Sequence, residues 1–214
     1  MEIDWPLVFS CVTAAAAVVA LLFSACQIRQ SNKQHLFDRR IRAWSISQSL
    51  IELYENERTS LFERSDGPEF GNDLQFAWLT NNSFLCGISE VVSHVLEEGR
   101  QRLFLQKMEE LKGIAVEVTL IFKKKPARLL GDFLQAYQTL LFVMYQYGIM
   151  LNNLERNAER FHWTLEEAVE KQGEEKIRCQ LYKARDKLQD TYEVLAEKKV
   201  PKRIEKQIRL SRWS

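Results

Sequence analysis

The chain has 214 residues, of which 46% are apolar and 28% charged, and its 30 basic residues nearly balance its 29 acidic ones. Glycine and proline together number only 12, roughly half the usual share. So few turn-forming residues argue against a sandwich, barrel or propeller. The charge balance argues against a generally basic nucleic-acid-binding protein. We therefore expect an all-α protein.

The N-terminal part of the chain contains an uncharged apolar run over residues 7–28. As a helix this run covers about 33 Å, enough for the roughly 30 Å hydrocarbon core of a bilayer. Glu2 and Asp4 precede it, whereas basic residues follow it: Arg29, Lys33, Arg39, Arg40 and Arg42. Positive charge stays on the cytoplasmic side. We therefore predict one transmembrane helix over 7–28 in the cell inner membrane, an external N-terminus over 1–6 and a cytoplasmic C-terminus.

Two other interpretations of the apolar segments must be weighed. The sequence Phe23-Ser24-Ala25-Cys26 resembles a lipobox, which would make the chain a lipoprotein with an extracytoplasmic helical domain. A second uncharged run lies between Asp132 and Glu155 and has the length of a second span. We assign that run to a soluble helix because its glutamines and asparagines would each need a hydrogen-bonding partner in hydrocarbon.

Residues 29–197 have the helical spacing of a cytoplasmic bundle of about five helices. The pattern predicts a helix from 29 to about 64, a short helix capped by Asn72 or Asp73 that ends at Leu79, and another over 84–95. A phase slip at Gly99 predicts a kink or a short break rather than one straight helix. The next apolar stripe has these members: Phe104, Met108, Leu111, Ala115, Val118 and Phe122.

The second half of the bundle contains its predicted central helix, which carries two apolar rows. The first row is Leu130, Leu134, Tyr137, Leu141, Met144, Gly148 and Leu151, and the second is Phe133, Leu140, Tyr147 and Leu154. Pro126 ends the preceding helix, so the lysines at 123–125 should lie at its C-terminus. Thr164 and Glu167 form a capping-box pattern that opens a charged helix. Its stripe from Ile177 to Leu195 suits an antiparallel partner or a short coiled coil.

The search for reactive groups is negative. His35, His94 and His162 have no helical metal-ligand partner, and the chain has neither Gly-x-Gly nor Gly-x-Ser-x-Gly. We therefore predict no catalytic residues, no metal site and no cofactor, and expect the protein not to be an enzyme.

The C-terminal segment over 198–214 is strongly basic. Its basic residues are Lys198, Lys199, Lys202, Arg203, Lys206, Arg209 and Arg212. Ile204, Ile208 and Trp213 share one face of a helix that Pro201 would help to start. We predict a basic amphipathic tail that contacts anionic lipid headgroups. A solubilising disordered tail and a helix packed on the bundle are the alternatives, and we expect no nucleic-acid partner.

Several segments resemble a large set of uncharacterised bacterial single-pass membrane proteins. They are Leu36-Phe37-Asp38-Arg39-Arg40 with Ile41 and Trp44, the stretch from Ser83 to Phe104, and residues 120–154. In these proteins a span is followed by a basic helix and a helical domain. The resemblance implies a membrane-anchored helical domain without catalytic residues. We therefore expect an interaction or scaffold protein that forms a homo-oligomer or binds a protein partner. The alternative is a membrane-associated effector or sensor, for example in phage defence.

Overall fold

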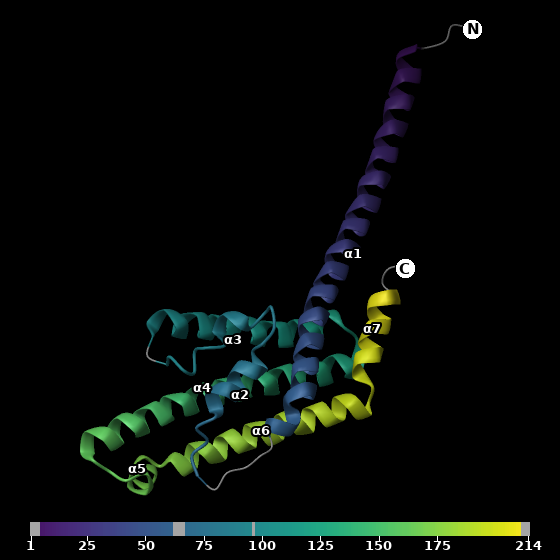
Figure 1. The fold of residues 1–214 in the computed structure, drawn as a ribbon. Helices are drawn as coiled ribbons and strands as arrows, with labels where there is room; N and C mark the ends of the chain where they lie inside the picture. The colour runs from purple at the N-terminus through teal and green to yellow at the C-terminus, as the bar shows by residue number, and fades with distance from the viewer. Residues whose placement is uncertain (1–4, 62–66, 96, 211–214) are drawn as a thin grey trace.

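The computed structural model describes residues 5–61, 67–95 and 97–210, and within them all regular structure is helical (Figure 1). The side chains at 5–8, 10–12, 15 and 210 lie outside this description. The described residues form seven α-helices and one short 3-10 helix. The predicted all-α class is therefore confirmed.

Helix α1 (Trp5–Leu61) is continuous over 57 residues. Residues 7–61 contain no glycine or proline, the residues that most often kink a helix. Figure 1 shows the N-terminal half of α1 projecting away from the other helices, while its C-terminal half packs among them. Arg40 is its first buried residue among the described side chains. The helix predicted from residue 29 thus continues without a break from the apolar segment.

A search of the described residues finds no helix with the length and apolar character needed to cross a bilayer. The transmembrane helix predicted over 7–28 falls partly on positions whose side chains are outside the description. It therefore stays a prediction.

Helix α4 (Lys124–Phe161) lies between α3 (Glu98–Ile121) and α6 (Glu174–Glu197), as Figure 1 shows. Every member of the stripe predicted from Phe104 to Phe122 is buried. Both rows predicted for α4 are buried except Leu151, which is half-buried. The predicted central helix is confirmed, because apolar side chains on two sides of α4 are buried.

The α-helix predicted over 84–95 is wrong. This segment forms turns around the 3-10 helix η1 (Cys86–Ile88). The Asn82 Oδ1 atom accepts hydrogen bonds from the backbone N–H groups of Phe84 and Leu85, at 3.0 and 2.8 Å, which favours a turn over a helix. The apolar residues that suggested a helix, among them Val91 and Val95, are buried all the same.

Two further predictions about helix ends need correction. Helix α2 (Asn72–Leu79) starts after Gly71 and has no side-chain cap; Asn72 instead donates to the carbonyl of Met144 at 2.9 Å. The capping box of Thr164 and Glu167 is confirmed. The helix it opens, α5 (Leu165–Gln172), has only eight residues and does not continue into the charged stripe. Gly173 adopts a left-handed conformation there, with φ 65°, so that α6 begins as a separate helix.

Candidate functional site

The basic tail predicted at the C-terminus forms helix α7 (Val200–Leu210), which packs on the bundle. Val200 and Ile204 are fully buried and Ile208 is half-buried. Pro201 lies in the first turn, as predicted. The basic residues on the outside are exposed: Lys198, Lys199, Lys202, Arg203, Lys206 and Arg209. The predicted site residue Arg212 lies outside the described residues, as does Trp213.

The three lysines at 123–125 lie at the start of α4 and not, as predicted, at the C-terminus of α3. Phe122 is the C-cap of α3 and Lys123 is the N-cap of α4. The backbone at both positions is extended, so the chain turns before Lys124 and Lys125 can continue α3. All three lysines are exposed.

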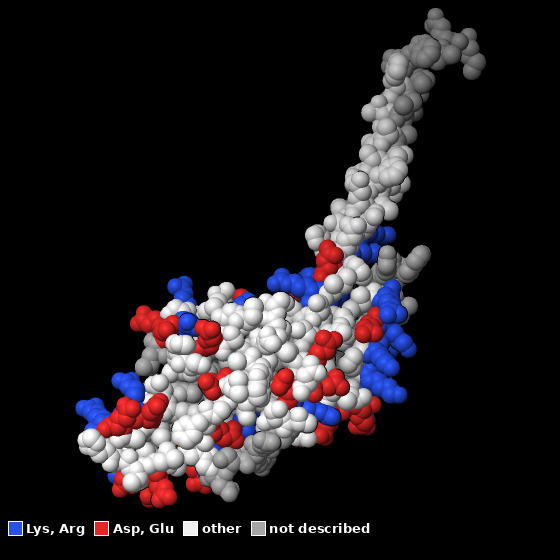
Figure 2. Space-filling view, viewed as in Figure 1, with Lys and Arg blue, Asp and Glu red and all other residues white. Residues whose placement is uncertain are grey.

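These lysines and α7 belong to one surface, because Gln207 on α7 binds both backbone groups of Lys123. The Lys123 N–H donates to Gln207 Oε1 at 2.7 Å, and Gln207 Nε2 donates to the Lys123 carbonyl at 3.3 Å. A hydrogen bond from Lys198, the charge of Lys198 and then that of Lys125 lower the pKa of Glu197. We call this the basic surface, made of residues 123–125, 198, 199, 202, 203, 206 and 209; Figure 2 shows blue side chains gathered along this edge of the bundle.

Helix α1 is tied to the same edge at the point where it enters the bundle. The buried Arg40 Nε donates to the carbonyl of Ile121 at 2.8 Å, and the guanidinium lies 5.9 Å from the centre of the Phe122 ring. Burial lowers the pKa of Arg40. The turn that carries the three lysines is therefore fixed to α1 on one side and to α7 on the other.

A second cluster consists of charged side chains in the interior. Glu69 and Arg185 are both buried and form an ion pair. One guanidinium nitrogen of Arg185 donates to Glu69 Oε1 at 3.0 Å, while the other also donates to Gln75 Oε1 at 2.6 Å. This pair was not predicted from the sequence, because no local spacing links residues that are so far apart in the chain.

The buried Glu174 extends this cluster. It accepts a hydrogen bond from the Tyr147 hydroxyl and lies 3.4 Å from Arg178 Nε. The Tyr147 oxygen in turn accepts from the Glu69 backbone N–H at 2.9 Å. Burial, and then the hydrogen bond to Glu174, raise the pKa of Tyr147. The cluster joins the segment before α2 to α4 and α6, so its evident role is to fix these elements.

The described residues bring no group of three His, Cys, Asp or Glu side chains together in a way that could hold a metal ion. The three histidines lie apart: His35 on the projecting part of α1, His94 in the turns before α3, and His162 at the end of α4.

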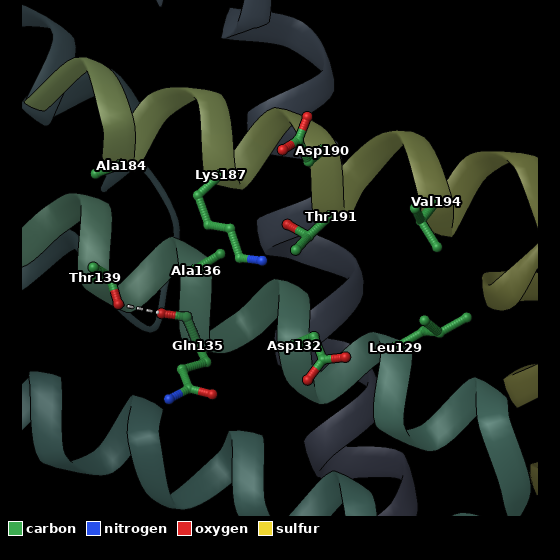
Figure 3. A pocket seen from close by; sticks show the side chains of 10 residues that line it. All are labelled: Leu129, Asp132, Gln135, Ala136, Thr139, Ala184, Lys187, Asp190, Thr191 and Val194. Atoms are coloured by element: carbon green, nitrogen blue, oxygen red, sulfur yellow. Dashed lines mark hydrogen bonds between the residues drawn. The ribbon is translucent and has the colours of Figure 1, made fainter.

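A groove of about 520 Å³ runs between α4 and α6 (Figure 3). Small side chains leave it open: Ala136, Thr139, Ala184 and Thr191. Lys187 extends from α6 into the groove (Figure 3), and Asp132 on α4 and Asp190 on α6 are among the residues that line it. The groove therefore offers both signs of charge beside a shallow apolar floor.

No protein family model, curated protein or solved structure matches this chain. The described residues present three candidate surfaces for function: the projecting part of α1, the basic surface and the groove between α4 and α6.

Proposed function

We propose that the protein is a membrane-anchored helical interaction protein, held in the cell inner membrane by one span over residues 7–28. The observation that carries this proposal is the exposure of apolar side chains on the projecting part of α1. Every side chain from 16 to 36 is exposed, and Leu21, Leu22 and Phe23 are 71%, 67% and 67% exposed. Successive residues of a helix lie about 100° apart, so these three point in different directions.

Such a segment is unfavourable in water, because each large apolar side chain left exposed forgoes about 1.5–3 kcal/mol of burial free energy. A helix that is apolar all round is covered by lipid or by a protein core. Arg29 and Lys33 follow the run, whereas Glu2 and Asp4 precede it. The proposed orientation therefore has the N-terminus outside and the bundle in the cytoplasm.

The bundle is the proposed interaction module, and the proposal includes no catalytic activity. We propose that the groove between α4 and α6 receives a second copy of the chain. Lys187 and the two aspartates of the groove support this choice, since a two-fold axis through the groove can place the lysine of each copy beside an aspartate of the other. An interface of this kind is self-complementary.

The anchor is tested by placing two charges at the centre of the proposed span. Val18→Arg with Val19→Arg should move the full chain from the membrane fraction to the supernatant after alkaline extraction, since each arginine costs about 2.5–3.5 kcal/mol at the centre of a span. The control is Leu120→Arg, at a leucine of α3 that is 78% exposed, which should stay in the membrane fraction. Recovery of the unmodified full chain in the aqueous fraction after gentle lysis would overturn the anchor.

The interface is tested by filling the groove. Thr139 is exposed and lines it, so Thr139→Trp should convert the dimer to a monomer, measured by the mass of the full chain in nanodiscs. Gln146→Trp is the control, because Gln146 is an exposed residue of α4 that does not line the groove. A monomeric unmodified protein would contradict the proposed dimer without affecting the anchor.

A further inference from the structure

We propose that the basic surface binds the anionic headgroups of the bilayer in which α1 is anchored. Two segments about 75 residues apart in the chain supply it, and neither has the whole set of charges by itself. The inference rests on the proposed function for the position of the bilayer, and it names the partner of this edge of the bundle.

The charge of the surface is strongly one-sided. Residues 123–125 and 197–209 contain nine basic and two acidic side chains, and all nine basic ones are exposed. One of the two acids, Glu197, is already paired with Lys198. The other, Glu205, is half-buried. A surface of this composition attracts anionic lipid, and the attraction grows with each Lys or Arg held near the bilayer.

The charges are held in place by the fold. Val200 and Ile204 bury the inner face of α7, and Gln207 fixes its outer end to Lys123. The turn at Lys123 is fixed to α1 through Arg40. Binding therefore requires little ordering of the backbone, unlike binding by a disordered tail.

The distance between the proposed bilayer and the bundle also supports headgroup binding. Arg40, at the entry to the bundle, is twelve helical positions after Ile28, at the end of the apolar run, a rise of about 18 Å. Headgroups occupy about 5–8 Å of this. The remaining gap of about 10 Å is close to the Debye length of about 8 Å at physiological salt. Helix α7 contacts α1, and its C-terminal end points the same way as the projecting part of α1 (Figure 1). Arg209 lies in the last turn of α7, at the end that points toward the proposed bilayer.

The test is lysine footprinting of the full chain in nanodiscs, with phosphatidylglycerol mixed into phosphatidylcholine or with phosphatidylcholine alone. Acylation of the surface lysines, read by mass spectrometry, should slow about threefold or more with the anionic lipid, and 1 M salt should abolish this protection by shortening the Debye length to about 3 Å. The exposed Lys112, Lys176 and Lys183 serve as internal controls and should react equally in both. Equal acylation of the surface lysines in the two lipids would overturn the proposal.

A variant separates the surface from general charge effects. Lys202→Gln, Arg203→Gln, Lys206→Gln and Arg209→Gln together should remove the protection of the lysines at 123–125. A matched variant removes four exposed basic side chains elsewhere (Arg102, Lys112, Lys176 and Lys183, each to Gln), none of which lines the groove, and should keep that protection. If both variants lose it equally, the specific surface is refuted.

Two further arms make the outcomes distinguishable. A full chain that fails to enter nanodiscs refutes the anchor, and the surface is then tested by flotation with preformed vesicles of the same two compositions. Salt-sensitive flotation with anionic vesicles alone supports headgroup binding, whereas equal flotation with both overturns it. Protection by duplex DNA in neutral nanodiscs, without protection by anionic lipid, would also overturn it, because the surface would then bind nucleic acid.

Discussion

Arg185 of α6 and Glu69 of the segment before α2 are 116 residues apart in the chain and form an ion pair inside the bundle. The side chain of Arg185 is only 2% exposed and that of Glu69 only 6% exposed. Neither charge can return to water without moving the segment that carries it. The pair therefore holds the start of α2 against α6.

Breaking this pair should destabilise the protein strongly. Arg185→Ala leaves the Glu69 carboxylate buried and unpaired, so we expect the free energy of unfolding to fall by about 3–5 kcal/mol. Replacing both charges, by Arg185→Met with Glu69→Leu, should cost much less. Urea unfolding of the full chain in detergent measures both changes. Arg100→Ala, which removes an ion pair with the exposed Glu90, is the control and should change stability little. If Arg185→Ala lowered the free energy of unfolding no more than Arg100→Ala does, the predicted role of the buried pair would be refuted.

Two buried tyrosines should respond in opposite ways to loss of the hydroxyl group. The Tyr54 hydroxyl is buried without a hydrogen-bond partner, so Tyr54→Phe should raise the free energy of unfolding by about 1 kcal/mol. The Tyr137 hydroxyl donates to the carbonyl of Leu79 at 2.6 Å, so Tyr137→Phe should lower it by a similar amount. Thermal and urea unfolding measure both variants. A change of the same sign in the free energy of unfolding of both would contradict the prediction.

The same tyrosines predict a loss of stability at alkaline pH. Burial raises the pKa values of Tyr54, Tyr137 and Tyr147 in the folded state. Below the ordinary tyrosine pKa of about 10, the three tyrosines are protonated in both the folded and the unfolded state. Their full contribution to the free energy of unfolding is therefore present there. Above pH 10 the unfolded state ionises first, so each tyrosine lowers stability by about 1.4 kcal/mol per pH unit. Unfolding measured between pH 9 and 11 should show this slope, and Tyr54→Phe should reduce it; an unchanged slope in that variant would argue against the assignment.

Gly148 of α4 packs tightly against Val92 in the turns before α3. A Cβ atom there would lie 2.6 Å from Val92 Cγ1, so Gly148→Ala should destabilise the protein by about 1–3 kcal/mol. Adding Val92→Ala should recover part of the loss, as measured by urea unfolding. Gly113→Ala is the control, because nothing lies within 4 Å of its Cβ position and an alanine in a helix should stabilise by about 1 kcal/mol. Equal effects of the two alanines would refute the close contact.

Local periodicity was sufficient to predict the helices that form the core. The stripe from Phe104 to Phe122 and the two rows of α4 are buried as predicted, with Leu151 only half-buried, because a helix with this spacing has one way to remove its apolar residues from water. The capping box of Thr164 and Glu167 was predictable for the same reason, since both its hydrogen bonds lie within four residues.

Features set by distant contacts were not predictable from spacing. Residues 84–95 have helical spacing, yet Asn82 and the contact of Val92 with α4 hold them in turns. The ion pair of Glu69 with Arg185 leaves no local pattern. The basic surface was only half predicted, because nothing in the sequence shows that Gln207 joins the lysine run to the tail.

The segment of α1 between residues 29 and 39 joins the apolar segment to the bundle as uninterrupted helix, because it has no glycine, proline or helix break. Its length sets how far the bundle stands from the apolar segment, and its phase sets which side of the bundle faces which way. Adding one residue would rotate the bundle by about 100° and lift it by 1.5 Å.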